Sequence, residues 1–420
     1  MASGGFKDVL KNGGFQAFLW TQFLGAFNDN AYRIIVSLRA VDLVQNPAIR
    51  DRYLAAAVAL FVLPSLFFTG YAGHLADAFS KRKVLIAVKA FEILVMAAGI
   101  LTLRSSSVAW MFVVLFLMAV HSTVFSPAKY SIVPEIVEEK DLSRGNALLE
   151  MSTLVAIILG IASGSFLYKE WKAEAWRIGV VLLGIAAAGF LASLRITRVP
   201  AAGAREPFRL NPFAEIVTGT RHLLRDRPLW LSVLGISYFW FIGALFQSDL
   251  VDLGKETLKA SDGQVGLLLA CVSIGIGAGA MLAGRLSGDK VEIGLVPLGS
   301  ILLGGFSVAV WFVGGSYTGA LVALFLLGGA AGLFFVPLNA FLQDRAGAGE
   351  KGRLIATNNV YNTIGMLLAA GVFVVCRNAL HMTPQGIILT LNGETLKPLG
   401  RSGEVKSIHL TRDDLKNPAP

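Results

Sequence analysis

The chain has 420 residues, of which 55% are hydrophobic and only 15% are charged, and 45 are glycine. A soluble domain carries about a quarter charged residues, so the composition excludes an ordinary soluble protein and indicates an all-α polytopic membrane protein. Glycine is frequent in such proteins because small residues let transmembrane helices approach closely. The net charge of +9 fits basic loops that fix membrane topology, and we expect no nucleic-acid partner.

Apolar segments of about 20 residues, the length that spans a bilayer, fall into two groups. The first group lies at 15–38, 54–76, 84–103, 108–127, 147–167 and 178–194, and the second at 229–250, 264–284, 293–314, 317–340 and 354–377. We therefore predict an N-terminal six-helix bundle over 1–194, a basic linker over 195–228, a C-terminal bundle over 229–391 and a polar tail over 392–420.

The linker carries many arginines, and its second half has apolar residues at Phe213, Ile216, Val217 and Leu223. This helical spacing predicts an amphipathic helix, which either lies on the membrane surface or forms a solvated linker. Lys and Arg are about twice as frequent in the segments that would lie inside as in those outside. This bias predicts a multi-pass protein of the bacterial inner membrane with a cytoplasmic N-terminus and linker.

The two groups of helices resemble each other in sequence. Pro127 and Pro337 occupy similar stretches, VFSPAKYSIVPEIV and FFVPLNAFLQDRA, and lie 210 residues apart. Similar loops begin at Gly73 and Gly284, each after the second span of its group. An internal repeat of this length predicts two six-helix bundles about a pseudo-twofold axis, the plan of many secondary transporters.

Polar residues cluster in the first span, where Asn28, Asp29, Asn30 and Arg33 interrupt an apolar run. Charged groups at bilayer depth are costly, so they face a cavity or a partner. The spacing puts Asp29, Asn30 and Arg33 on neighbouring helical faces. Two interpretations stay open: a packing network with an internal ion pair, or a site in which Arg33 binds a phosphate and Asp29 binds an ammonium group.

Other polar residues in the spans are candidates for substrate contact by the same reasoning. They are Lys129 just past the fourth span, Asn146 and Glu150 in the fifth, Gln247 late in the seventh, Asn339 at the end of the tenth, and Asn358 and Asn362 in the eleventh. Glu92 and His121 occur singly in their spans and are interpreted as packing groups. We predict no metal site and no cofactor, because zinc spacing and phosphate-binding loops are both missing from the sequence.

The loop after the second span, GHLADAFSKRK from Gly73, resembles the signature of the major facilitator superfamily. Gly73, Asp77, Lys81 and Arg82 match it, whereas Ala78 and Ser80 depart from it, and the second copy from Gly284 has its Asp289 shifted by one position. The resemblance implies the major facilitator fold and a gating latch between the halves. The alternative is a plain tight turn with positive charges.

More specific stretches, TQFLGAFNDNAYR, SPAKYSIVPEIV and RGNALLEMSTLVAIILG, resemble the lysophospholipid transporter family and the transporter portion of fused acyltransferase and acyl-acyl-carrier-protein synthetase proteins. The resemblance implies a flippase, not an enzyme, that moves lysophospholipids such as lysophosphatidylethanolamine inward by alternating access. It also implies membrane lipids and a cytoplasmic acyltransferase or synthetase as partners. The alternatives are a proton-coupled carrier of a small polar solute or drug, and a non-transporting membrane partner of an acyltransferase.

The end of the chain departs from the expected pattern of twelve helices. A twelfth helix would begin near Thr383, but GIILTL is its only apolar core, and this is too short to span a bilayer. The sequence therefore predicts an incomplete twelfth helix and leaves open whether the chain is shortened here.

Overall fold

The computed structural model describes residues 6–43, 47–105, 107–201, 211–288, 290–312, 315–347 and 349–376. Within these ranges the protein is built of helices without a β-strand. The helices before the linker are α1 Phe6–Lys11, α2 Gly13–Leu43, α3 Pro47–Ala78, α4 Lys81–Ser105, α5 Val108–Ile136, α6 Leu142–Trp171 and α7 Trp176–Ser193. Short 3₁₀ turns at Glu139–Asp141 and Lys172–Glu174 flank α6.

The linker and the second half contain α8 Pro212–Arg225, α9 Arg227–Asp252, α10 Asp262–Leu286, α11 Leu295–Phe312, α12 Tyr317–Arg345 and α13 Lys351–Val374, with a π-helical turn at Leu253–Thr257. Each of the eleven predicted spans corresponds to one helix, and α8 is the predicted amphipathic helix. Among the described residues, seven helices are long and apolar enough to cross a membrane: α4, α5, α6, α7, α9, α10 and α12.

Two helices extend beyond the predicted spans 108–127 and 317–340, and both contain proline. α5 continues through Pro127 and Pro134 to Ile136, and α12 continues through Pro337 to Arg345. Transmembrane helices tolerate proline because neighbouring helices and Ser or Thr hydroxyls satisfy the freed backbone groups.

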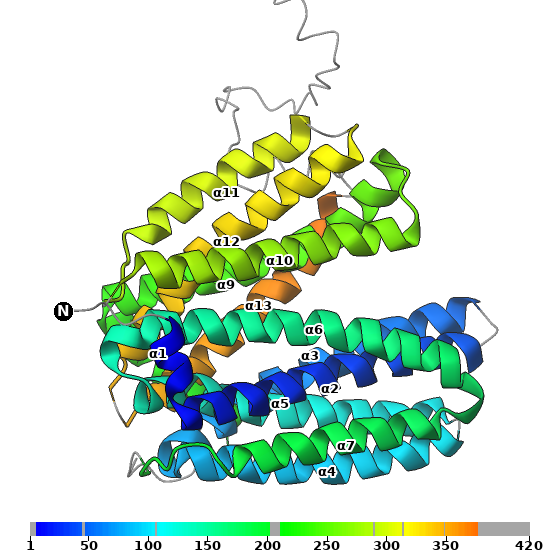
Figure 1. The fold of residues 1–420 in the computed structure, drawn as a ribbon, viewed down its shortest axis with the longest axis horizontal. Coiled ribbons are helices and arrows are strands. Elements are labelled where there is room, and N and C mark those ends of the chain that lie inside the picture. Colours follow the sequence, from blue (N-terminus) through cyan, green and yellow to red (C-terminus); the bar gives the residue numbers. More distant parts are fainter. Residues whose placement is uncertain are drawn as a thin grey trace, which may run out of the picture.

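The helices form two groups, with α2–α7 in the lower part of Figure 1 and α9–α13 in the upper part. Between the groups, α3 packs on α13 and α6 packs on α10. These pairs join the second helix of one half to the fifth of the other, in both directions, as a pseudo-twofold axis requires. The boundaries at 194 and 228 stay a prediction.

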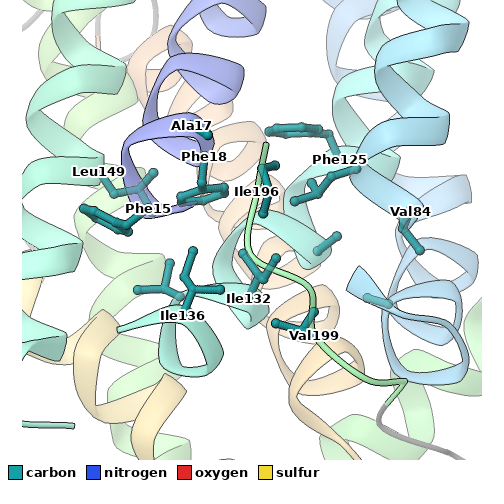
Figure 2. Packing of buried hydrophobic residues seen from close by; sticks show 14 of the residues in the cluster. Phe15, Ala17, Phe18, Val84, Phe125, Ile132, Ile136, Leu149, Ile196 and Val199 are labelled. Carbon is teal, nitrogen blue, oxygen red and sulfur yellow. The ribbon is translucent and has the colours of Figure 1, made fainter. Parts of the chain in front are cut away.

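The start of the linker belongs to the core of the first half. Ile196 and Val199 are buried in a cluster with Phe15 and Phe18 of α2 and other apolar residues, and Figure 2 shows the linker segment passing between these side chains. Ser80 also donates its hydroxyl proton to the carbonyl of Val199 at 2.7 Å. The packed core of the first half therefore extends past the end of α7 at Ser193, at least to Val199.

Three predictions fall on residues that the structure does not describe. The incomplete twelfth helix and the polar tail lie beyond Cys376, and Asp289 lies in a gap between α10 and α11.

Candidate functional site

The polar residues of α2 point to different partners. Asn28 is fully buried and donates to Glu92 Oε1 at 3.0 Å and to the carbonyl of Leu182 at 3.2 Å. Asp29 accepts a hydrogen bond from the hydroxyl of Ser122. The structure therefore fixes Asn28 in packing with α4 and α7, while Asp29 faces α5.

Arg33 lies one turn further along α2, and its described hydrogen bond goes to a neighbour on the same helix. Arg33 Nη2 donates to Asn30 Oδ1 at 2.9 Å, and Asn30 in turn donates to the carbonyl of Ala26 at 2.8 Å. Asn30 thus orients the guanidinium. Asp29 Oδ1 is buried and has no hydrogen-bond partner among the described residues.

Glu92 and His121 do not occur singly, as expected, but have charged neighbours. Glu92 forms a salt bridge with Lys89, and both side chains are completely buried. His121 Nε2 lies 3.2 Å from Glu92 Oε2, and His121 Nδ1 lies 3.9 Å from Asp29 Oδ1. Asn28, Asp29, Lys89, Glu92, His121 and Ser122 therefore make one cluster, which we call the α2–α4–α5 network.

Two glycines make room for the lysine of this network. A Cβ atom at Gly25 of α2 would lie 2.9 Å from Lys89 Nζ, and one at Gly189 of α7 would lie 2.9 Å from Lys89 Cε. A larger residue at either position would displace the ammonium group. The sequence shows these glycines but gives no sign that a lysine from another helix fills the space beside them.

A second polar cluster lies between α2, α5 and α6. Lys129 was expected just past a helix end, but it lies inside α5 and is buried. Its Nζ donates to Thr153 Oγ1 at 3.0 Å, and Tyr130 donates to Glu150 Oε1 at 3.0 Å. Thr153 also donates to Gln22 Oε1 at 2.9 Å. Lys129 and Glu150 are therefore both held by neighbours within the first half.

The candidate residues of the second half are less concentrated. Asn339 donates to the carbonyl of Phe335 in its own helix at 3.2 Å, and Asn362 accepts from the hydroxyl of Ser237 at 3.0 Å. Asn358 is buried, and its Oδ1 has no hydrogen-bond partner among the described residues. The side chain of Gln247 lies outside the described part of the chain.

Two amide contacts cross between the halves. Asn146 of α6 and Gln343 of α12 exchange two hydrogen bonds of 3.0 and 2.7 Å, and both side chains are buried. Asn359 of α13 donates to Ser126 Oγ of α5 at 2.9 Å. Asn146, expected at a substrate site, thus ties the two halves together, and Gln343 is a partner that spacing along α6 could not reveal.

The signature loop also crosses between the halves. The carboxylate of Asp77 accepts the backbone N–H groups of Gly352 at 2.6 Å and Arg353 at 2.7 Å. These belong to the first turn of α13, where unpaired N–H groups and the helix dipole favour an anion. Lys81 and Arg82 act within the first half: Lys81 Nζ lies 2.6 Å from Glu135 Oε1 and Arg82 donates to the carbonyl of Leu194 at 2.6 Å.

The two signature glycines occupy equivalent contacts. A Cβ at Gly73 of α3 would lie 2.6 Å from Ala356 Cβ on α13, and one at Gly284 of α10 would lie 2.9 Å from Ala147 Cβ on α6. Both helix pairs therefore come close only because these positions carry no side chain. Asp77, Gly73 and Gly284 make up the contact region that we call the closed end.

Sequence reasoning missed the charged residues that extend the closed end to α8. Arg353 Nη2 donates to Glu350 at 3.2 Å, and Arg353 Nη1 lies 3.7 Å from Glu215 of α8. His222 of α8 lies 3.1 Å from Glu350. Nearby, a hydrogen bond from Arg345 holds the pKa of the Asp226 carboxyl below its usual range. Among the described residues, no group of three His, Cys, Asp or Glu side chains is arranged to hold a metal ion.

The fold and the buried polar groups together define a polytopic membrane transporter made of two helical halves. Solved structures share this fold. The TM-score is 0.73 with the transporter FucP in its outward conformation, at 16% identity over 90% of this chain and 95% of that one. It is 0.72 with the human organic anion transporter MFSD10, at 17% identity over 90% and 97%.

Sequence comparison identifies the family. The Major Facilitator Superfamily model matches residues 18–370. The Lysophospholipid transporter LplT of Klebsiella pneumoniae is 31% identical over 366 residues, 86% of this chain and 88% of that protein. The transporter of the same name from Yersinia enterocolitica is 30% identical over 379 residues, 88% of each chain. The chain belongs to the Major Facilitator Superfamily and, within it, to the family of these lysophospholipid transporters.

Proposed function

We propose that this protein transports lysophospholipids across a bacterial inner membrane by alternating access between its two halves. The relatives support this function because they are about 30% identical over most of the chain and are themselves lysophospholipid transporters. They do not favour the alternative of a carrier for a small polar solute. The observation that carries the proposal is the pair of Asp29 and Arg33 on one stretch of α2.

The chemistry of this pair fits a zwitterionic headgroup. In the α2–α4–α5 network Lys89 already neutralises Glu92. Asp29 Oδ1 lies 3.9 Å from His121 Nδ1 and accepts no hydrogen bond from a described residue, so it is the carboxylate oxygen that we propose for an ammonium group. Arg33 lies four residues on, about 6 Å along the helix axis. Its planar guanidinium can donate to two phosphate oxygens at once. One ethanolamine phosphate group can therefore contact both residues.

The other candidates take different places in this proposal. Lys129 and Glu150 extend the polar surface of the first half toward α6, and Asn30 orients Arg33. Asn339, Asn358, Gln247 and Asn362 stay candidates from the second half. Asn28 supports Glu92, and Asn146 belongs to the contacts that close one end.

The state of the transporter follows from its orientation. If the N-terminus is cytoplasmic, as the charge bias predicts, the closed end with Asp77 faces the cytoplasm, and we propose that substrate enters from the opposite, outer side. A cysteine introduced at the exposed Lys11 should then react with a membrane-impermeant thiol reagent only after the membrane is permeabilised.

A partner on the cytoplasmic side would complete the pathway. We propose that the imported lysolipid is re-acylated by a cytoplasmic acyltransferase or acyl-acyl-carrier-protein synthetase, as the sequence resemblance implies. Transport in the presence of such an enzyme should yield diacyl lipid in the inner leaflet, and no such product should form without the transporter.

The function is tested with purified protein in phospholipid vesicles and two labelled substrates. Arg33→Gln should lower transport of both lysophosphatidylethanolamine and lysophosphatidylglycerol about tenfold or more, because both carry the phosphate that Arg33 would bind. Asp29→Asn should lower transport of the ethanolamine lipid by a similar factor and that of the glycerol lipid much less, because only the first carries an ammonium group.

Two charge-matched variants control this experiment. Asp8→Asn and Arg104→Gln remove exposed charges and should leave transport of both lipids unchanged. Wild-type rates in both Asp29→Asn and Arg33→Gln would refute the headgroup site, and no transport of either lipid by the unmodified protein would refute the function.

A further inference from the structure

The linker helix α8 has three distinct sides. It begins at a cap in which Asn211 Oδ1 accepts the N–H of Phe213 at 3.0 Å, with Pro212 in the first turn. One side faces the protein: Glu215 and Leu223 are buried, and a Cβ at Gly219 would clash with Thr357 Oγ1 on α13. The other two sides of the helix are exposed.

The first exposed side is apolar. Phe213 is 49%, Val217 47% and Leu224 57% exposed. Positions 213, 217 and 224 are four and seven residues apart, so the three side chains lie on one face of the helix. A solvated linker helix would not need this apolar face, because large exposed apolar patches mark interaction sites.

This apolar side continues the surface of a membrane-spanning helix. The ring of Phe213 lies 6.4 Å from the ring of Phe67 on α3, centroid to centroid. Phe67 is itself 48% exposed, and Leu63, one turn away on α3, is 40% exposed. Because α3 is the second predicted span, we expect its exposed apolar residues to face lipid, and the apolar side of α8 continues this surface.

The second exposed side is basic. Arg221 and Arg225 are exposed and lie four residues apart, and Arg221 follows Val217 by four residues, so the basic side lies next to the apolar side. An amphipathic helix with this arrangement lies in the headgroup layer, with its apolar side toward the acyl chains. Arginine there attracts anionic headgroups and can bind their phosphates.

We propose that the outer face of α8, formed by Phe213, Val217, Leu224, Arg221 and Arg225, is a docking surface for anionic phospholipid of the surrounding membrane. The lipid lies with its acyl chains against Phe213 and Phe67 and its headgroup against the two arginines. This surface is separate from the α2–α4–α5 network, so the proposal does not depend on which molecule is transported. On this proposal α8 lies on the membrane surface and is not a solvated linker helix.

The test measures contact between α8 and lipid directly. Val217→Cys, in a background with Cys271→Ala and Cys376→Ala, is labelled with an environment-sensitive fluorophore. The full-length protein is reconstituted in vesicles of phosphatidylcholine and phosphatidylglycerol, with either lipid brominated. Brominated phosphatidylglycerol should quench the label at least about threefold more strongly than brominated phosphatidylcholine, and Arg221→Gln with Arg225→Gln should bring this ratio to about one.

A matched double variant distinguishes a defined surface from general attraction by charge. Arg195→Gln with Arg198→Gln removes two exposed arginines of the linker outside α8 and should keep the preference. Absence of quenching by either lipid would overturn the proposal and leave the apolar face to a protein partner. Equal quenching by both brominated lipids would overturn the anionic docking surface. Equal loss of the preference for phosphatidylglycerol in the two double variants would overturn it as well. Unchanged thermal unfolding confirms that the variants fold.

Discussion

The salt bridge between Lys89 and Glu92 has no exposed surface on either side chain. Removing one partner of such a pair leaves a buried charge without compensation. Glu92→Gln keeps an oxygen that can accept from Asn28 but removes the negative charge. It should therefore destabilise the protein by about 3–5 kcal/mol, measured as a lower thermal unfolding temperature of the purified protein in detergent.

The matching double variant separates the charge from the shape of the site. Lys89→Met combined with Glu92→Gln should recover most of the lost stability, because no unpaired charge remains. Lys11→Gln breaks the exposed pair with Asp8 and should change the unfolding temperature little. If Glu92→Gln is as stable as the parent, the buried pair does not have the energetic role that its geometry implies.

At the scale of single residues, the sequence located polar side chains that the structure buries within the helices, but it predicted few of their partners. Helical spacing relates Arg33 to both Asp29 and Asn30, and Arg33 bonds to Asn30. Asp29 instead bonds to Ser122 of α5, which spacing along α2 could not predict. Contacts such as Glu92 with His121 depend on how α4 and α5 are placed beside each other. The periodicity of a single sequence does not show how two helices pack, so Glu92 and His121 were taken to be isolated.

At the scale of helices, the two closest approaches between the halves depend on Gly73 and Gly284. A Cβ at Gly73 would lie 3.0 Å from the carbonyl oxygen of Gly352 and 2.6 Å from Ala356 Cβ. Gly73→Ala and Gly284→Ala should each weaken the closed end by about 1–3 kcal/mol, the usual cost of overpacking. This corresponds to roughly a 5- to 150-fold shift of the equilibrium toward the open state.

A cysteine pair across the closed end measures this shift. Ser143 Oγ of α6 lies 3.4 Å from the carbonyl oxygen of Lys290, so Ser143→Cys and Lys290→Cys should react with a short thiol cross-linker only when this end is closed. Gly184→Ala is the control, because a Cβ at Gly184 would meet open space. Equal cross-linking in Gly73→Ala, Gly284→Ala and the parent would contradict the prediction.

The helices themselves were largely predictable, because eleven long apolar runs leave little choice of element. Their ends were less so. The sequence placed an end at Pro127 in α5, where the helix continues to Ile136, because transmembrane helices tolerate proline. Ile196 and Val199 were assigned to the basic linker, although their apolar side chains pack into the core of the first half.

At the scale of the whole molecule, the internal repeat predicted the arrangement better than any local feature. Two similar halves require equivalent contacts across the axis, and the pairs α3 with α13 and α6 with α10 meet this requirement. The repeat could not predict that the two contacts differ in chemistry. Asp77 binds backbone N–H groups where α3 meets α13, whereas Gly284 of α10 meets the methyl group of Ala147 where α10 packs on α6.

This difference predicts that Asp77 controls the balance between the closed and open states of the transporter. Its carboxylate accepts two backbone hydrogen bonds at the start of α13, and bonds to a charged group contribute about 1.5–3 kcal/mol each. Asp77→Asn removes the negative charge. It also replaces one of the two accepting oxygens with an NH2 group, which cannot accept a hydrogen bond from a backbone N–H. In the background of Ser143→Cys and Lys290→Cys, cross-linking between the two introduced thiols should therefore fall about tenfold or more.

The control for this prediction is Asp8→Asn, which should leave the cross-linking unchanged. Because α13 also holds α8 through Arg353 and Glu215, opening of the closed end should loosen that helix as well. Unchanged cross-linking in Asp77→Asn would refute the latch, since the two hydrogen bonds from α13 would then contribute nothing to the balance between the closed and open states.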